Sequence, residues 1–266
     1  MALAVCATPI GNLDDVTLRV LEELRSADVI LCEDTRHTRV LLDRHGISGK
    51  LVSYHEHNEA KRAAEVLPRM EAGERFALVS DAGMPAISDP GARLVAAALE
   101  RGVPVTVLPG PTAVDTALVA SGFPAERYQF VGFLPRGARA LASLWEELAS
   151  WPHPVVAFES PRRLPATLRS LADAQPAREV AVCRELTKKF EEVVRGTAAE
   201  LAARFAEAPK GEITLVLGHG SPSADVGGAI AAVGELVSAG LPRRQAADVV
   251  SRLTGASRNE LYRRTL

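Results

Sequence analysis

The sequence predicts an α/β protein with two tandem α/β domains and a small helical appendage at its C-terminus. Three observations predict it. Short apolar runs alternate with segments of helical periodicity, this alternation restarts after residues 112–124, and no strand signal follows Ser221. The 266 residues, 47% of them hydrophobic, are enough to give two domains a core each.

The first domain, predicted over residues 1–114, contains five short strand-like runs. Each run is mostly apolar and is followed by a turn and then a segment of helical period, which is typical of a parallel sheet with helical crossovers. The runs are LAVCAT (3–8), DVILCED (28–34), KLVSYHE (50–56), RFALVSD (75–81) and VTVLPG (105–110).

The second domain, predicted over residues 115–221, repeats this pattern, and residues 222–266 form the appendage. The appendage is expected to end in two short helices split by TGAS, with Ser257 and Glu260 in capping-box spacing. The strand-like runs are RYQFVGFLP (127–135), PVVAFESP (154–161), REVAVCREL (178–186), EEVVRG (191–196) and EITLVLGH (212–219), with amphipathic segments such as 140–151 and 198–208 between them.

Composition excludes several classes of protein. No apolar run is long enough to span a bilayer, and Pro9 and Gly11 interrupt the N-terminus too early for a signal peptide, so a cytoplasmic protein is expected. The net charge of −2 gives no bulk attraction for nucleic acid, so any RNA contact requires local basic patches. Cys6, Cys32 and Cys183 lie singly in apolar runs and are predicted to be buried thiols.

The loops that follow the first five strands predict a ligand site. They read TPIGN, EDTRHT, YHEHNE, SDAGMP and PGPT, and in an open parallel sheet such loops converge on one edge. In VSDAGMPAISDP (79–90), small residues allow a ligand to approach the backbone and two prolines stiffen the loop. The alternative is a pair of tight turns in which Asp81 and Asp89 act only as local caps.

Familiar nucleotide and hydrolase motifs are absent. The sequence has no GxGxxG after its first strand, no GxxxxGK[ST] and no GxSxG. His55 and His57 would face one way on an extended segment, with Glu56 and Glu59 near. Because no third ligand has suitable spacing, hydrogen bonding is expected in preference to a metal site.

A set of motifs in fixed order resembles one known family. They are ATPIGNLDDVTLR, CEDTRHTRVLL, YHEHNE, ALVSDAGMPAISDPG, PGPTA, GFLPR, FESPRR, RELTKKFEEVVRGT and GEITLVL. Together they cover essentially the whole chain and resemble the bacterial small-subunit rRNA methyltransferase I family. Those enzymes are 16S rRNA cytidine 2′-O-methyltransferases within the tetrapyrrole methylase superfamily. The resemblance implies two α/β domains of the tetrapyrrole methylase type, with S-adenosylmethionine held in the cleft between them.

The resemblance also implies the residues that hold the cofactor. Met84, Ala86 and Arg162 depart from the family pattern, which usually has Thr, Leu and His there, and this puts fine substrate contacts in question rather than the reaction. The implied cofactor-binding residues are Pro9, Ile10, Gly11, Asp81, Ala82, Gly83, Met84, Thr112 and Ala113.

Methyl transfer to a ribose hydroxyl benefits from a base or from a cation that stabilises the developing alkoxide. Glu185 and Lys188 are the candidate catalytic residues, with a solvated charge run as the alternative. The candidate RNA-binding residues in the converging loops are Arg36, Arg39, His55, His57, Asn58, Arg136, Arg162 and Lys189, although each alone can be an ordinary surface residue.

Two other functions stay open: C-methylation of a tetrapyrrole, and noncatalytic RNA binding. The family resemblance suggests a homodimer acting on 16S rRNA of the small ribosomal subunit, and the exposed-looking GFLP stretch (132–135) either joins protomers or packs internally. The arginine-rich tail resembles a helix-turn-helix and is expected either to bind RNA or to cap the fold.

Overall fold

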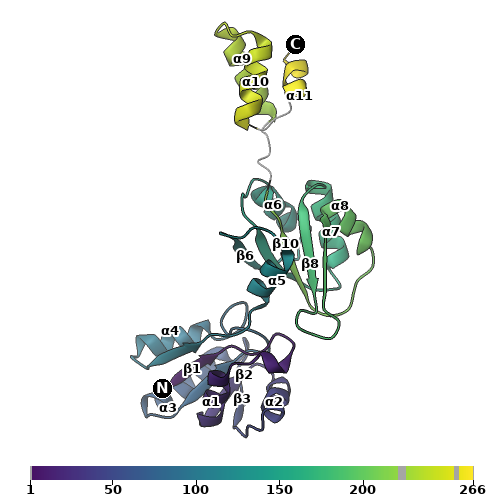
Figure 1. Ribbon diagram of the computed structural model, residues 1–266. Helices are drawn as coiled ribbons and strands as arrows, with labels where there is room; N and C mark the ends of the chain where they lie inside the picture. The colour runs from purple at the N-terminus through teal and green to yellow at the C-terminus, as the bar shows by residue number, and fades with distance from the viewer. Residues whose placement is uncertain (1, 221–225, 255–257, 266) are drawn as a thin grey trace.

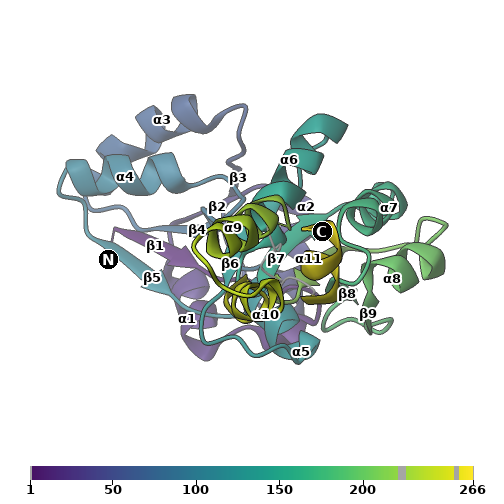
Figure 2. The same cartoon turned by 90° about the horizontal axis from the view of Figure 1, so that it is seen from above.

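Two five-stranded sheets and a separate group of three helices make up the molecule (Figure 1). The computed structural model describes residues 2–220, 226–254 and 258–265. The sheets lie one above the other in Figure 1, and Figure 2 views the same arrangement from the side of the C-terminal helices. Among these residues, no helix has the length and apolar character that crossing a membrane requires.

The first sheet is wholly parallel, as the sequence predicts. Its strand order is β3-β2-β4-β1-β5, and alternate side chains of each strand enter different cores. Leu3 and Val5 pack on one face, whereas Ala4 and Cys6 pack on the other. The strands are β1 (Leu3–Cys6), β2 (Val29–Cys32), β3 (Leu51–Ser53), β4 (Phe76–Val79) and β5 (Val105–Leu108).

Helices cover both faces of this sheet. Helices α1 (Leu18–Ser26) and α2 (Thr35–Arg44) pack on the face of Ala4, and α3 (Glu59–Glu71) and α4 (Ala92–Glu100) pack on the face of Leu3. A 3₁₀ turn, η1 (Leu13–Asp15), precedes α1. Because both faces are covered, the strand ends and their loops are the parts of this sheet that remain available to a ligand.

The second sheet is mixed, with the order β6-β7-β10-β8-β9. Strands β6 and β7 are parallel, but β10 runs antiparallel to β7 and β8, and β8 runs antiparallel to β9. All five predicted strands are present, although the sequence pattern did not indicate the antiparallel pairing. They are β6 (Gln129–Phe133), β7 (Val155–Glu159), β8 (Glu179–Arg184), β9 (Glu192–Thr197) and β10 (Ile213–Leu217).

One face of the second sheet is covered by α6 (Ala138–Ala149), α7 (Leu164–Ala174) and α8 (Ala198–Arg204). The other face carries α5 (Ala113–Ser121), which follows β5 of the first sheet in the chain. Ile10 of the first domain joins the same apolar cluster as Leu186 of the second. The chain therefore changes from one sheet to the other between β5 and α5.

The C-terminal unit contains three helices around their own small core. They are α9 (Val226–Ser238), α10 (Arg243–Thr254) and α11 (Arg258–Arg264), and Val233, Ala247 and Leu261 are buried between them. The two helices expected around TGAS correspond to α10 and α11. Helix α9 was not predicted, because its glycines and nearly uniform apolar residues show little helical periodicity in the sequence. Ser257, the expected N-cap, lies outside the described residues.

All three cysteines are free and buried, which confirms their predicted role as small apolar residues. Burial raises the pKa of the Cys6 and Cys183 thiols to about 12, so both stay protonated at neutral pH.

Candidate active site

The loops at the carboxyl edge of the first sheet are tied to one another by hydrogen bonds. The Thr8 amide donates to the Gly83 carbonyl at 2.8 Å, and the Gly83 amide donates to the Thr8 carbonyl at 3.0 Å. The Thr8 hydroxyl donates to the Ser80 carbonyl at 3.0 Å, and the Asp34 amide donates to Asp81 Oδ1 at 3.1 Å. The loops after β1, β2 and β4 therefore form one connected edge, as their sequences predict.

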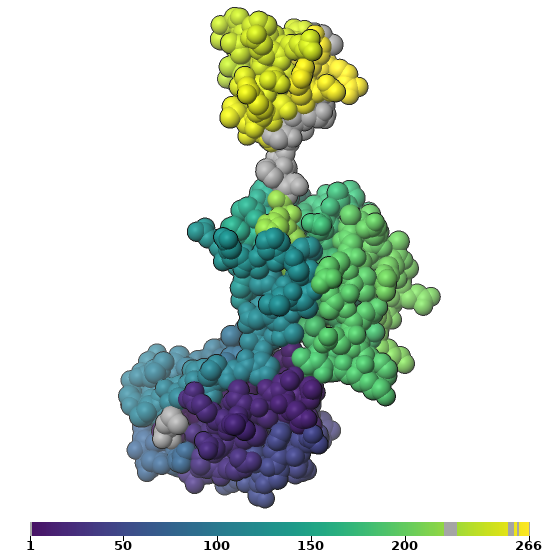
Figure 3. All heavy atoms as spheres, in the orientation of Figure 1, coloured from purple at the N-terminus to yellow at the C-terminus, as the bar shows by residue number. Residues whose placement is uncertain are grey.

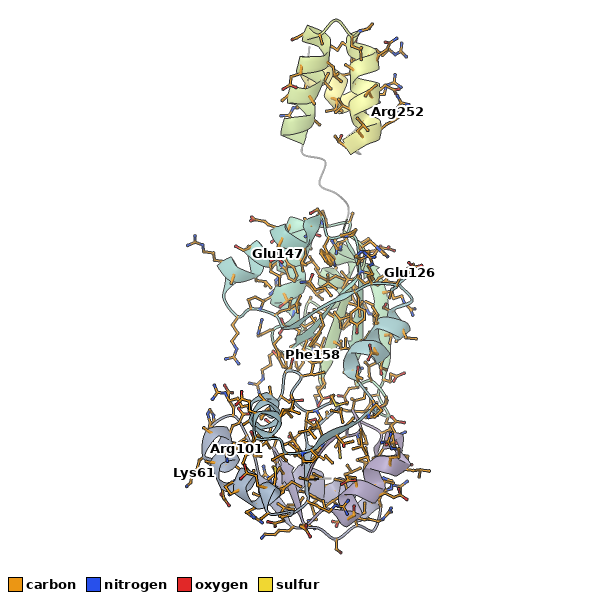
Figure 4. The ribbon with its side chains drawn as sticks, turned by 90° about the vertical axis from the view of Figure 1, so that its left-hand side faces the viewer. Lys61, Arg101, Glu126, Glu147, Phe158 and Arg252 are labelled. Atoms are coloured by element: carbon orange, nitrogen blue, oxygen red, sulfur yellow. The ribbon has the colours of Figure 1, made fainter. Side chains whose placement is uncertain are left out.

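A cleft of about 400 Å³ lies between this edge and the second sheet. Figure 3 shows the narrow waist where the two domains meet, and Phe158, at the end of β7, faces the first domain in Figure 4. The first domain and α5 contribute Ile10, Asp81, Ala82, Ser88, Asp89 and Ala113; the second sheet and its loops contribute Phe133, Phe158, Glu159, Ser160, Pro161, Cys183, Leu186, Glu212, Ile213 and Thr214.

A smaller chamber of about 180 Å³ adjoins the cleft. Its walls include Met84, Ile87 and Tyr128, so it is largely apolar. The residues that line both spaces are Ala82, Asp89, Ala113 and Phe158. These four residues therefore mark the junction of the cleft and the chamber, and a ligand that spans the two spaces passes them.

The first-domain wall of the cleft is acidic. Burial, followed by the nearby carboxylates of Glu33 and Asp81, raises the pKa of Asp89 to about 7. The pKa of Glu33 is also raised, mainly by burial and then by Asp81. An acidic wall stabilises a cation and disfavours anions, so the cleft suits a positively charged ligand with apolar parts.

The second-domain wall is organised by Glu159, whose side chain is fully buried. One carboxylate oxygen accepts from the Ser160 amide at 2.7 Å, and the other accepts from the Thr167 hydroxyl at 2.6 Å. Arg163 Nη2 lies 3.2 Å from the same carboxylate and also donates to the Leu134 carbonyl at 2.9 Å. Glu159 and Arg163 thus fix the ESPRR loop against the GFLPR loop.

The structure brings most of the predicted cofactor residues together. Ile10, Asp81, Ala82 and Ala113 line the cleft, and Gly83, Met84 and Thr112 join Ala82 and Ala113 in the chamber. Pro9 and Gly11 line neither space. Pro9 is buried and lines a separate small cavity that Asp81 also lines. Gly11 faces the turn at 186–188, where a Cβ would lie 2.9 Å from the Leu186 carbonyl oxygen.

S-adenosylmethionine fits these residues on chemical grounds. Asp81 and Asp89 would favour its sulfonium cation, and Phe158, Leu186 and Ile213 would offer apolar contacts to its adenine. Thr112 caps the N-terminus of α5 by accepting a hydrogen bond from the Asp115 amide. Ala113, Val114 and Asp115 of the first turn line the chamber, so the positive end of the helix lies at the chamber wall and would suit a carboxylate placed away from Asp115.

The two predicted catalytic residues do not line the cleft. Lys188 Nζ lies 3.1 Å from Glu185 Oε1 and 3.0 Å from Glu212 Oε2, and of these three residues it is Glu212 that lines the cleft. Burial alone would raise the pKa of Glu185 and lower that of Lys188. Hydrogen bonds from the Glu212 amide and from Lys188 outweigh burial at Glu185, so the pKa of Glu185 is lowered. Hydrogen bonds to the carboxylates of Glu212 and Glu185 outweigh burial at Lys188, so the pKa of Lys188 is raised. Both groups therefore stay charged, and neither is poised to accept a proton.

The predicted RNA-binding residues are spread over both domains rather than gathered at the cleft. Arg36, on α2, forms a two-bond ion pair with Asp34. The His55 amide donates to Asn58 Oδ1, and Asn58 Nδ2 lies 3.2 Å from His55 Nε2. Both side chains therefore stabilise their own loop. The exposed members of the set are Arg36, Arg39, His57, Arg136, Arg162 and Lys189. Over the described chain, no group of three or more His, Cys, Asp or Glu residues is placed to hold a metal ion.

Sequence reasoning missed several lining residues. Asp89 was singled out only as a turn residue, yet it lies at the junction of the two spaces. Phe158 and Glu212 lie in the FESPRR and GEITLVL motifs, which carry the family resemblance without indicating a role for either side chain. The signal available for Asp89 was its place in a loop with another carboxylate beside a buried strand.

Comparison with known sequences gives consistent matches. The profile of the tetrapyrrole (corrin/porphyrin) methylases matches residues 2–202, and that of the RsmI C-terminal HTH domain matches residues 224–266. A protein from Mesorhizobium japonicum named ribosomal RNA small subunit methyltransferase I is 44% identical over 100% of this chain and 91% of its own length. A protein of the same name from Thermotoga maritima is 47% identical over 81% of this chain and 97% of its own.

Solved structures share the fold at low identity. Uroporphyrin-III C-methyltransferase from Thermus thermophilus, determined with S-adenosyl homocysteine, superposes with a TM-score of 0.58 and is 22% identical, covering 81% of this chain and 96% of that one. This similarity establishes the two-sheet architecture.

Proposed function

Because the chain belongs to the tetrapyrrole methylase family, in its ribosomal RNA small subunit methyltransferase I group, we propose that it methylates 16S rRNA. The proposed reaction transfers a methyl group from S-adenosylmethionine to the 2′-hydroxyl of a cytidine ribose in the decoding centre of the small subunit. The specific nucleotide and oxygen follow from the family resemblance of the motifs. We also propose that the protein acts in the cytoplasm, because its proposed substrate is the small ribosomal subunit.

The cleft between the two sheets is the observation that carries this proposal. It places a first-domain edge that suits a sulfonium opposite an apolar wall that suits an adenine. The full-length identity to a protein named ribosomal RNA small subunit methyltransferase I, and the match to the RsmI C-terminal domain, favour RNA over a tetrapyrrole as the substrate. A cleft with these walls also argues against a purely noncatalytic RNA-binding module.

The bound cofactor supplies an electrophilic methyl group. The chain's own residues bind and orient: Asp81 favours the cation, and Phe158 and Leu186 exclude water from the cleft. We assign Lys188 the role of a fixed positive charge beside the cleft, held there by Glu185 and Glu212. Exposed Arg39, Arg136, Arg162 and Lys189, together with Arg36 and His57, are proposed to contact RNA, and His55 and Asn58 to shape their loop.

A transfer assay with labelled S-adenosylmethionine tests the proposal. Small ribosomal subunits are expected to be methylated and uroporphyrinogen is not, with the label released from RNA as 2′-O-methylcytidine. Asp81→Ala is expected to abolish cofactor binding while the protein stays folded, and Asp173→Ala, which removes an exposed carboxylate on α7, serves as the control. Methylation of the tetrapyrrole instead of the RNA would refute the proposal.

We also propose that the protein acts as a homodimer. Leu134 of the GFLP stretch is buried in the second-domain core, whereas Phe133 beside it is 61% exposed. The Phe133 ring also lines the cleft and packs on Phe158 at a ring-centroid distance of 5.5 Å, so only its outer part is offered to a partner. A dimer doubles the basic surface offered to a folded RNA. Sedimentation that finds a monomer at micromolar concentration would exclude it.

A further inference from the structure

Asp89 occupies the point where the cleft and its side chamber meet. It lines both spaces, as do Ala82, Ala113 and Phe158, and of these four residues it alone carries an ionisable side chain. Of the residues assigned to the cofactor, Ile10 and Asp81 line the cleft and Gly83, Met84 and Thr112 line the chamber, so a cofactor that contacts both groups passes Asp89. A group at this junction therefore lies inside the space open to a ligand rather than at its periphery.

The loop that carries Asp89 is held in a strained conformation. Ala86 and Ser88 have positive φ angles of 68° and 62°, which non-glycine residues seldom adopt. Gly91 has φ 133°, and its amide donates to the buried Glu59 Oε1 at 3.0 Å. A Cβ at Gly91 would lie 2.8 Å from Leu78 Cδ2, so the loop also packs closely on β4. The surrounding structure thus fixes where Asp89 lies.

The Asp89 carboxylate is suited to exchange a proton. Within the described part of the chain it has no hydrogen bond or ion pair to another side chain, in contrast to Glu185. Its pKa of about 7 results first from burial and then from Glu33 and Asp81. The charged groups around the cleft are Glu33 after β2, Asp81 after β4, Glu159 paired with Arg163 on the β7 side, and Glu212 paired with Lys188 before β10. Asp115 of α5 lines the chamber with Asp89.

We propose that Asp89 is the general base that takes the proton of the acceptor hydroxyl. The proposal deepens the function proposed above and rests on it. The O–H bond of the ribose breaks and its proton passes to the carboxylate. The oxygen forms a bond to the methyl carbon, and the carbon–sulfur bond breaks with its electron pair left on the sulfur, which becomes a neutral thioether. Asp89 then releases the proton to water, so charge and atoms balance.

The test compares Asp89→Asn, an isosteric change, with Asp89→Glu and with Asp173→Asn as a matched surface control. Single-turnover methylation of small subunits at saturating cofactor is expected to fall by about 10² to 10⁴-fold in Asp89→Asn. Cofactor affinity, measured by calorimetry, is expected to change by less than about tenfold, because Asp81 remains. Asp89→Glu is expected to restore part of the rate, since it restores the carboxylate.

Two pH measurements distinguish a base from a structural residue. In a pH–rate profile, the wild-type rate is expected to fall about tenfold per pH unit below the pKa of the base. This acidic limb of the profile is expected to be absent in Asp89→Asn. Independently of activity, carboxyl-carbon NMR of the cofactor-free protein is expected to show one aspartate that titrates near pH 7 and is missing in Asp89→Asn. A bound sulfonium lowers this pKa, so the kinetic limb lies at lower pH than the NMR titration.

The outcomes separate this inference from the function on which it rests. Wild-type protein that fails to methylate ribosomal RNA overturns the proposed function and the inference together. An active wild type beside an equally active, folded Asp89→Asn overturns the inference alone. A slow variant that keeps the acidic limb, or a wild type without an aspartate titrating near neutrality, also overturns it. Loss of the rate together with the limb supports it.

Discussion

Replacing Gly11 by alanine tests how closely the two domains must approach. A Cβ at Gly11 would lie 2.8 Å from Thr187 Oγ1 and 2.9 Å from the Leu186 carbonyl oxygen, and it would also overlap the Lys188 side chain. Overpacking of this kind costs typically about 1–3 kcal/mol. Thr187 Oγ1 also accepts from the Asn12 amide at 3.0 Å, and losing that bond adds about 1 kcal/mol. The total is about 2–4 kcal/mol.

We expect the domains to relieve this overlap by moving apart, which widens the cleft beside Ile10. If about 2 kcal/mol of this cost destabilises the arrangement of the two domains that binds the cofactor, cofactor affinity weakens by about 30-fold. Calorimetric titration with S-adenosylmethionine measures this change in affinity. Gly137→Ala is the matched control, because a Cβ there meets nothing within 4 Å. A Gly11→Ala protein that binds the cofactor as tightly as Gly137→Ala would refute the reasoning.

Three further predictions address the second domain, the charge cluster and the tail. Glu159→Gln removes the charge of a fully buried carboxylate that is paired with Arg163, and it is expected to lower the free energy of unfolding by about 3 kcal/mol in denaturant titrations. Glu65→Gln, at a carboxylate that is 47% exposed, is expected to cost less than about 1 kcal/mol, and equal effects would contradict this. Lys188→Ala is expected to lower the single-turnover rate at saturating cofactor more than it weakens cofactor affinity, and an unchanged rate would remove Lys188 from the mechanism. Deleting residues 222–266 is expected to leave cofactor binding intact while weakening RNA binding and its salt dependence, and an unchanged salt slope would exclude the tail from RNA binding.

The strands could be predicted from the sequence because each is a short apolar run bounded by turn residues. The direction of pairing in the second sheet could not, because β8 and β9 are joined by the 185–191 turn and strand composition does not reveal orientation. For the site, the loops that follow parallel strands predicted where Asp81 lies. Glu185, the candidate base, does not line the cleft; it lies in a turn where its φ is 52°, and no local sequence pattern indicates that conformation.

Backbone strain connects the parts of the site that sequence reasoning missed. Ala86, Ser88, Glu185 and Thr187 are the described non-glycine residues with positive φ, and all four lie in the two loops that border the cleft region. Each such conformation costs about 1–3 kcal/mol and persists only where the surrounding structure enforces it. In one loop the strain aims Asp89 into the junction; in the other it turns Glu185 toward Lys188 and away from the cleft. The proton acceptor and the fixed cation are thus separated by backbone geometry, and the choice between two carboxylates depends on conformation rather than on residue type.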